Sequence, residues 1–346
     1  MKKKITNINF KCFQHPWDRD ALLVLEKAKG INIVIEKMTE WGSERDFKIY
    51  NISDNIRLSK KQCPSIYNLL LEAASILDIN QLPELYIDSD YSINTYSFGI
   101  GNNIIVLCSG LIEVMSEDEL LAVIGHELGH IKCNHMLYKT LAYFLSFGGE
   151  LLSSIIPLGG KIVDIAIKSA IDEWLKMSTL TCDRAALLVT QNSEVVAKML
   201  SKLAGFSATR ILDEVNIDEV LLQAKEYEMC NKKMDKVLKY LQNRNRTHPL
   251  PIIRVKEIIE WSQSEDYRNI MEGNYLKNED DKKLSTNVNK DTTVDMVHKT
   301  KDKLNTINEQ AKQKAKESVE FVSEKKNIFM KSSKKLTQKL SEKIKF

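Results

Sequence analysis

Two histidines and a glutamate fall within one short stretch, Ile124 to His135, as His126, Glu127 and His130 in the pattern H-E-x-x-H. On a helix the two histidines lie about one turn apart, so both imidazoles face the same side and can bind one metal ion. Zinc is the expected metal, and Glu127 lies close enough to take a proton from a metal-bound water. The stretch therefore predicts a metal site with two protein ligands and one general base.

The residues around the motif predict the helix that must position it. Ser116 followed by Glu119 forms a capping-box sequence, which predicts where this helix begins. Gly125 and Gly129 flank the ligands although glycine costs a helix about 1 kcal/mol, which indicates that another element packs closely there or that substrate approaches. Apolar residues recur through the stretch at helical spacing, at Leu120, Leu121, Val123, Ile124, Leu128 and Ile131.

Length and composition indicate one catalytic domain with an appendage. The 346 residues are 43% hydrophobic and 28% charged, enough to bury a sizeable core. The net charge of +3 is uneven, because residues 301–346 hold 13 lysines against 6 acidic residues. The six scattered cysteines form no C-x-x-C pair, and the basic N-terminus lacks the apolar run of a signal peptide. We therefore expect reduced thiols and a cytoplasmic location, with membrane association as an open alternative.

Periodicity predicts a mostly helical α+β fold with a small antiparallel sheet. We expect strands at Glu84 to Asp88 and Asn103 to Cys108, and an extended segment at Phe47 to Leu58. A strand that ends shortly before the metal helix could hold an extended peptide across the metal, or could simply belong to the sheet. Helices are expected at residues 14–42 with a break at Gly30, and at 64–77, 172–192, 197–206, 215–229 and 254–261.

An apolar region, Leu137 to Ile171, follows the motif. Its longest uncharged stretches, Leu141 to Gly149 and Leu151 to Gly160, are shorter than the roughly 18 residues of a spanning helix. We favour a hydrophobic hairpin inside the protein over one that dips into a membrane.

The composition changes after about Ser262. The predicted domains are an N-terminal segment that packs on the catalytic domain (1–62), the catalytic domain itself (63–262), a disordered linker (263–293) and a basic amphipathic helical tail (294–346). The tail could lie on an anionic membrane surface, pair with a partner helix or remain a solvated tail. Nucleic acid is not an expected partner, because the lysines of the tail have no interleaved aromatic residues.

Several linked motifs resemble a known family in their order. They resemble the zinc metallopeptidases that include the membrane protease HtpX, the CAAX prenyl endopeptidases and many soluble bacterial relatives. The resemblance covers about residues 15–261 and has no counterpart for the tail. Besides the motif helix, the matching residues are Glu84 to Tyr86, Asn94, Phe98-Gly99, Ile105-Val106, Ser109 to Leu111, Cys182 to Leu188, Thr247 to Pro249, and Arg254.

The resemblance implies a third zinc ligand, a glutamate four residues before an aspartate on a downstream helix. Here the aspartate is Asp183, and the ligand position holds Thr179, whose hydroxyl is a poor zinc ligand. Of the substitutes on a helical wheel, Asp183 is the best placed, and Cys182 offers a soft thiolate. His135 is expected to point away from the motif face.

The resemblance also implies roles for two later residues. His248 would stand near the metal and stabilise the charge on the attacked carbonyl, while Arg254 would brace that loop. The leading hypothesis is a zinc-dependent endopeptidase that cleaves unfolded or membrane-associated polypeptides. One alternative, motivated by Thr179, is a weakened or inactive homologue that binds proteins. Another makes the tail the active part, as a membrane-binding module.

Overall fold

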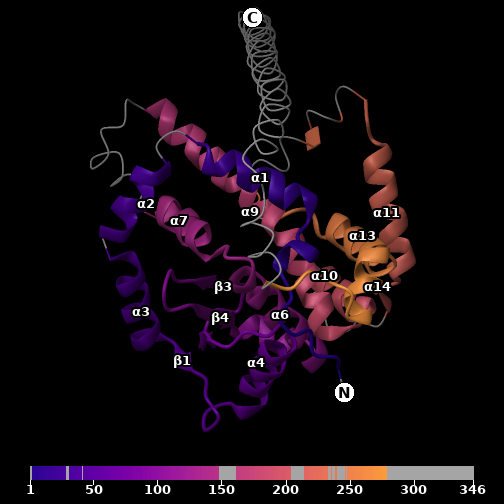
Figure 1. The fold of residues 1–346 in the computed structure, drawn as a ribbon, viewed down its shortest axis with the longest axis horizontal. Helices are drawn as coiled ribbons and strands as arrows, with labels where there is room; N and C mark the ends of the chain where they lie inside the picture. The colour runs from indigo at the N-terminus through magenta and orange to yellow at the C-terminus, as the bar shows by residue number, and fades with distance from the viewer. Residues whose placement is uncertain are drawn as a thin grey trace, which may run out of the picture. The chain divides into compact units, whose positions relative to one another are not determined.

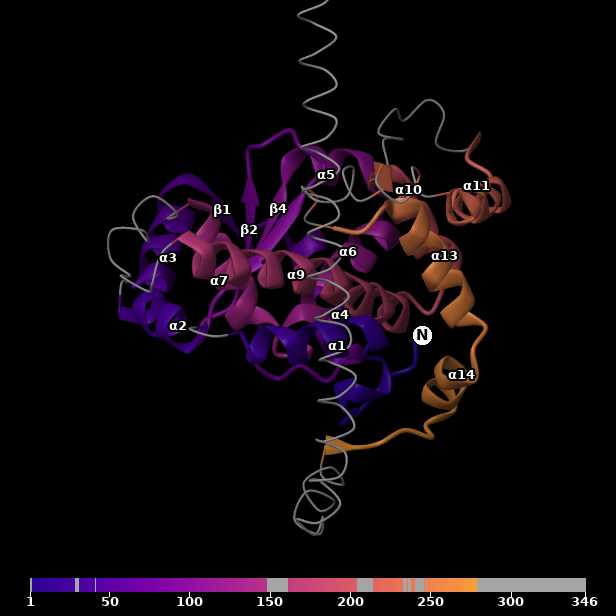
Figure 2. The same cartoon turned by 90° about the horizontal axis from the view of Figure 1, so that it is seen from above.

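The computed structural model of the protein describes residues 2–28, 31–40, 42–147, 161–203, 214–232, 235, 238–239, 246 and 248–278. In this part of the chain helices predominate and one four-stranded sheet is present (Figures 1 and 2), which confirms the predicted mostly helical α+β fold. No helix in these ranges is both long enough and apolar enough to cross a membrane.

A short 3-10 turn, η1 (Phe10–Cys12), precedes the first two helices, α1 (Pro16–Glu26) and α2 (Ile31–Glu40). The side chain of His15 caps α1 by accepting a hydrogen bond from the backbone N–H of Trp17 at 3.2 Å. A proline at the first helical position suits a helix start, since its missing N–H would have had no partner there. The two helices predicted within residues 14–42 are therefore confirmed.

The predicted extended segment from Phe47 to Leu58 is wrong for most of its length. Residues Ser43–Asp54 form helix α3, and only β1 (Ile56–Arg57) is extended. The inward face of α3 carries a phenylalanine and then two buried asparagines, Asn51 and Asn55, at intervals of four residues. The amide of Asn55 donates to the side-chain oxygen of Asn51 at 2.9 Å. Because this face is polar, the sequence shows no helical spacing of apolar residues that would have predicted the helix.

The sheet is mixed, so the predicted antiparallel sheet is corrected. Its order is β1-β2-β4-β3, in which β2 (Glu84–Asp88) and β4 (Ile104–Cys108) run parallel and the two outer pairs run antiparallel. Strand β3 (Thr95–Phe98), which lies between β2 and β4 in the chain and pairs with β4, was not predicted from the sequence. Because β3 reverses the chain once, β4 returns in the direction of β2.

The helices that follow the sheet contain most of the predicted metal-site residues. The motif helix is α6 (Glu117–Lys132), and α9 (Lys161–Thr190) packs along it more extensively than any other element (Figure 1). The predicted capping box is present at the start of α6, because Ser116 and Glu119 each accept a hydrogen bond from the other's backbone N–H. The other helices are α4 (Pro64–Ile76), α5 (Ser109–Val114), α7 (Met136–Phe147), α10 (Ser193–Leu203), α11 (Ile217–Met229), α13 (Pro251–Ser262) and α14 (Glu265–Glu272).

The two glycines of α6 lie where α9 crosses it. A Cβ atom on Gly125 would lie 3.0 Å from Cβ of Val189, and one on Gly129 would lie 2.7 Å from Cβ of Ala185. The contact at Gly129 is shorter than real Cβ atoms show and the one at Gly125 is tighter than nearly all of them, so a larger residue at either position would force neighbouring atoms of α9 to shift. The predicted close packing at these glycines is confirmed, and it brings the backbone of α9 against the motif helix.

Two hydrophobic clusters hold these elements together. The first joins α4, α6, α10 and α13 with the sheet and the second half of α9, and the second joins α1, α2, α7 and the first half of α9. Leu141 of α7 and Ile171 of α9 are buried in the second cluster, so the described ends of the apolar region pack inside the protein. Residues 148–160, where the hairpin was predicted to fold, lie outside the described residues.

The predicted disorder of the linker is wrong for its first part. Helix α14 occupies residues 265–272, with Ser264 as its cap and Ile270 buried. The chain then returns to the N-terminus, where the backbone N–H of Asn9 donates to the carbonyl of Leu276 at 2.9 Å. The segment is polar in composition, yet the one isoleucine and a tyrosine are spaced to reach the first core cluster. Residues 279–346, including the predicted tail, lie outside the described residues.

Candidate metal centre

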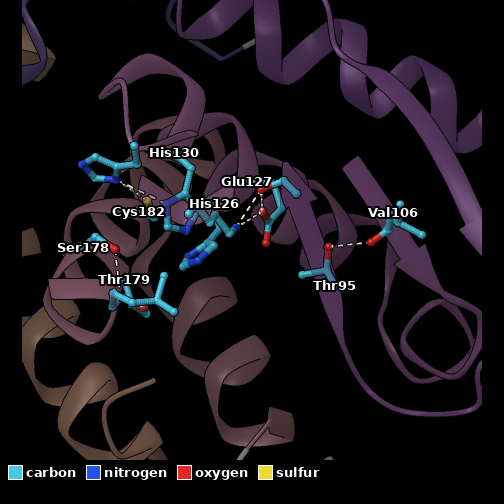
Figure 3. Close-up of polar contacts among 12 residues, drawn as sticks. Thr95, Val106, His126, Glu127, His130, Ser178, Thr179 and Cys182 are labelled. Atoms are coloured by element: carbon cyan, nitrogen blue, oxygen red, sulfur yellow. Dashed lines mark hydrogen bonds and ion pairs between the residues drawn. The ribbon is translucent and has the colours of Figure 1, made fainter. Parts of the chain in front are cut away.

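His126, Glu127 and His130 are almost fully buried on α6, with 6%, 2% and 2% of their surface exposed. Figure 3 shows them beside Thr179 and Cys182 of the facing helix α9. Their burial is what a metal site needs, because imidazoles kept from water stay neutral and can offer a lone pair. Burial first, and the charge of Lys139 second, hold the pKa of His130 well below its usual range.

A buried carboxylate orients His126. Oδ1 of Asp183 lies 3.0 Å from Nδ1 of His126, and Arg254 donates to both carboxylate oxygens at 2.7 and 2.8 Å. Burial alone would raise the pKa of Asp183, but the charge of Arg254 outweighs it and lowers the pKa to about 2. An ionised carboxylate only accepts hydrogen bonds, so the proton of His126 lies on Nδ1 and its Nε2 lone pair is left for a metal.

The predicted ligand role of Asp183 therefore does not fit the structure. Both of its oxygens are engaged by Arg254 and His126, and a residue so held orients a ligand instead of being one. Arg254 acts through Asp183, which is more specific than the loop-bracing role predicted for it. The threonine at the expected glutamate position is also engaged, since the Thr179 hydroxyl donates to the carbonyl of Leu175 at 3.1 Å.

A second chain of polar contacts lies behind His130. Its Nδ1 is 3.3 Å from Nδ1 of His135, and Nε2 of His135 is 3.3 Å from Oδ2 of Asp18 on α1. Asp18 is fully buried and also accepts a hydrogen bond from the hydroxyl of Thr181 at 2.7 Å. Asp18, His135 and His130 therefore form one buried polar chain that reaches the motif helix from behind.

His135 was predicted to point away from the motif face, and this is wrong. The helical wheel assumed that α6 continues through residue 135, but α6 ends at Lys132 and Asn134 has a left-handed backbone with φ of 58°. The turn carries His135 back over the helix end toward His130. The wheel could not show this because it places residues correctly only within one unbroken helix.

The candidate base Glu127 is held by a lysine. Nζ of Lys139 lies 2.8 Å from Oε2 of Glu127 and 2.7 Å from the hydroxyl of Ser97, which also donates to Oε2. Burial alone would raise the pKa of Glu127, but Lys139 above all lowers it to about 2. Glu127 is therefore ionised at neutral pH, which is the state a proton acceptor needs.

The sulfur of Cys182 completes a group of three donors. One nitrogen each of His126 and His130 and the Sγ atom of Cys182 lie within 4.8 Å of one another, and all three residues are buried. Two imidazoles and a thiol form a donor set that suits zinc or another thiophilic metal. The residues present therefore fit a metal ion.

A cleft of about 310 Å³ opens onto the motif. His126 and Glu127 reach it from α6, and His248, predicted to stand near the metal, lies on its wall with the side chain exposed. The packing around the cleft and then the charge of Arg254 lower the pKa of His248, so its ring is neutral. The other lining residues are Ile93, Asn94, Thr95, Leu111, Val123, Met199, Leu203, Arg246, Pro249, Pro251 and Arg254.

The structure thus brings together most of the predicted site and adds residues that the sequence did not reveal. His126, Glu127, His248 and Arg254 line one cleft, and His130 lies directly behind His126. The sequence did not predict three of these residues, Lys139, Ser97 and Asp18. Each comes from a different element, and its spacing from the motif in the sequence matches no recognisable pattern. Arginine or lysine near a buried carboxylate is a general expectation, but the sequence does not say which one.

The chain is similar in sequence to known proteins that are named as metallopeptidases or proteases. The chain is 35% identical over 262 residues to plastoglobule-localized metallopeptidase 48 of Arabidopsis thaliana chloroplasts, covering 75% of this chain and 74% of that protein. It is 28% identical over 117 residues to HtpX protease homologs of Streptococcus pyogenes serotypes M5 and M49, covering 33% of this chain and 38% of each. The name of the Arabidopsis protein places that relative in a chloroplast, and neither comparison supports the predicted cytoplasmic location.

The family assignment rests on the whole catalytic region. The sequence model of peptidase family M48 matches residues 60–262, a span that includes the motif helix, Asp183 and Arg254. This span leaves out α1, and therefore Asp18. The match covers more than half of the chain, in agreement with the resemblance read from the linked motifs. The chain belongs to peptidase family M48, the HtpX-like metallopeptidases.

Proposed function

We propose that the protein is a zinc-dependent endopeptidase. The observation that carries this proposal is the cleft, where a buried, ionised Glu127 lies beside His126, whose Nδ1 is held by a carboxylate. A zinc ion held there would supply Lewis acidity to the peptide carbonyl and make water a better nucleophile. The family assignment implies a metal ion and supports hydrolysis of polypeptides, and the choice of zinc is part of the proposal.

The residues of the chain divide the work. Glu127 takes the proton of the attacking water and later gives it to the leaving amine. Neutral His248, on the cleft wall, donates its N–H to the oxygen of the attacked carbonyl as negative charge develops there. Arg254 holds Asp183, and Asp183 holds His126.

Substrate would bind as an added strand. The sequence suggested the strand before the motif helix, but β4 is paired on both sides, by β2 and by β3. The edge of the sheet on this side is β3, and Thr95 at its start lines the cleft together with Ile93 and Asn94. An extended peptide paired with β3 would pass beside Glu127. Selection would then depend on an unfolded segment more than on particular side chains.

The test combines metal content with a paired substitution. We expect the purified protein to hold about one zinc and to cleave an unfolded substrate such as casein, and Glu127→Gln to abolish cleavage while leaving zinc bound. Glu117→Gln, an exposed position on the same helix, is the matched control and should retain activity. Cleavage by the Glu127→Gln protein at the native rate would exclude this mechanism.

A second function is favoured by Thr179 itself. Without the glutamate, the chain would be a weakened or inactive homologue that binds polypeptides in the same cleft. In that case the native protein should bind an extended peptide without cleaving it, and Thr179→Glu should create zinc binding and cleavage together. Efficient cleavage by the native protein would rule this alternative out. A membrane or partner helix for residues 294–346 remains a prediction, since these residues lie outside the described structure.

A further inference from the structure

We propose that Cys182 replaces the missing glutamate as the third protein ligand of the metal. This inference rests on the proposed function, because it concerns the metal of the same site. Its starting point is position: the Cys182 sulfur and one nitrogen each of His126 and His130 lie within 4.8 Å of one another. Among the described residues, no other histidine, cysteine or carboxylate side chain forms such a group with these two histidines.

The other candidates on α9 are already engaged. Thr179 donates its hydroxyl to the carbonyl of Leu175, so its oxygen is turned along its own helix. Asp183 has both oxygens bound by Arg254, and one of them also faces His126. Moving Asp183 to the metal would leave a buried guanidinium without its partner, which is costly. Cys182 is less engaged, since the contact of its sulfur with Nδ1 of His135 is long, at 3.8 Å.

The packing of the two helices compensates for the shorter side chain of cysteine. A glutamate at position 179 would reach across the gap with two more atoms than a cysteine has. At Gly129, a Cβ atom would lie 3.1 Å from Cα of Cys182, so the two backbones nearly touch at this point. The thiol of Cys182 therefore has a shorter gap to cross to the motif helix than a glutamate side chain would cover.

Charge balance also favours a thiolate. Glu127 is paired with Lys139, and Asp183 is paired with Arg254, so each of these two carboxylates beside the motif histidines is matched by a cation. Two neutral imidazoles then leave a divalent ion without a negative ligand. Coordination by Cys182 forms a metal–sulfur bond and releases the thiol proton to solvent, and the thiolate supplies the one negative charge that Thr179 cannot.

Cobalt substitution tests the sulfur directly. The protein is stripped with a chelator and loaded with Co²⁺, whose bond to a thiolate gives a near-ultraviolet charge-transfer absorption. We expect this band in the native protein and in Cys133→Ser, and its loss in Cys182→Ser. Cys133 is the matched control, because it is also a buried free cysteine of the same region. A band that survives in Cys182→Ser would overturn the inference.

A second measurement needs no variant and separates the outcomes. X-ray absorption of the zinc-loaded native protein should reveal one sulfur at about 2.3 Å and nitrogens at about 2.0–2.1 Å. Bound zinc with only nitrogen and oxygen neighbours would overturn the role of Cys182 and leave the proposed peptidase intact. Zinc bound through sulfur in a protein that cleaves nothing would keep the ligand and sink the proposed function. Failure to bind any metal would sink both.

Discussion

At the scale of single residues, the candidate base Glu127 depends on a lysine that the motif does not contain. Lys139 contacts both Glu127 and Ser97, and its side chain is only 15% exposed. The carboxylate is thus kept ionised in a place where burial alone would protonate it. What a substitution does here is decided by the charge that it leaves behind.

We predict that Lys139→Met destabilises the metal-free protein by about 3–5 kcal/mol, because it leaves a buried carboxylate without its cation. The double variant Lys139→Met/Glu127→Gln should recover most of this loss, since no charge is then left unpaired. Urea unfolding of the two single variants, the double variant and the native protein measures the coupling. Losses that simply add would show that the ion pair is not what stabilises this site.

The pair of Asp183 and Arg254 predicts a pH dependence. The pKa of Asp183 is about 2 in the folded protein and about 3.9 in an unfolded chain, so its contribution is present above about pH 4 and is lost as pH falls toward 2. We expect this to amount to about 2–3 kcal/mol.

The comparison is made on metal-free protein. Urea unfolding of the native protein and of Asp183→Asn is measured at several pH values between about 2 and 6. The native protein should lose more stability over this range than the variant, because the variant has no proton to bind at position 183. Parallel pH curves for the two proteins would contradict the assignment of Asp183 as the ionised partner.

At the scale of elements, helix α1 contributes to a site that lies more than a hundred residues along the chain. Asp18 reaches His135, and His135 reaches His130. Residues that orient a ligand through its second nitrogen typically change metal affinity by about 10- to 100-fold when they are removed, and Asp18 holds the residue in that position, His135. The N-terminal helix is therefore more than the packing layer predicted from its sequence.

We expect Asp18→Asn to weaken zinc binding by about tenfold or more, measured by competition with a chromophoric chelator. Asp20→Asn, exposed on the same helix, is the control and should bind zinc like the native protein. Thermal unfolding of the metal-free proteins tells a loss of orientation from a loss of fold. Equal zinc affinity in both variants would mean that Asp18 only fills space.

The elements themselves show what the sequence can and cannot reveal. Helix α6 was predictable because a capping box, an apolar period and two glycines all agree, and each of these signals is local. Helix α3 was not, because its fully buried residues are asparagines, and β3 was not, because it is only four residues long and lies within a polar, glycine-containing stretch. The roles of Asp183, His135 and Lys139 depend on which elements meet. Contacts between segments that are far apart in the sequence produce no recognisable pattern of residue spacing.

At the scale of the whole molecule, the last described segment packs against the first. Residues 264–278 return to the first turn of the chain, where Ile8 and Lys277 form a β-bridge and the Tyr275 hydroxyl donates to the carbonyl of Thr6 at 3.0 Å. A boundary after residue 262, as predicted from composition and as matched by the family, cuts through this packing.

We predict that a chain ending at residue 278 unfolds at the same temperature as one that includes residues 279–346, while a chain ending at residue 262 is less stable. The loss should be at least the burial of Ile270, about 1.5–3 kcal/mol. Thermal and urea unfolding of the three chains test this. The same shortened chain, ending at residue 278, is the proper partner for a liposome-binding comparison of the tail, since it keeps the packing of residues 264–278 against the start of the chain.

The wide spacing of the site residues along the chain has a consequence in time. Asp18, His126, Asp183 and Arg254 come from four helices, and the last of these, α13, is made after all the others. At a synthesis rate of about 5–20 residues per second, the orienting contacts of His126 cannot form until many seconds after the motif itself has been made. The proposed activity on unfolded chains would thus be absent for as long as the protein's own nascent chain is the nearest unfolded polypeptide.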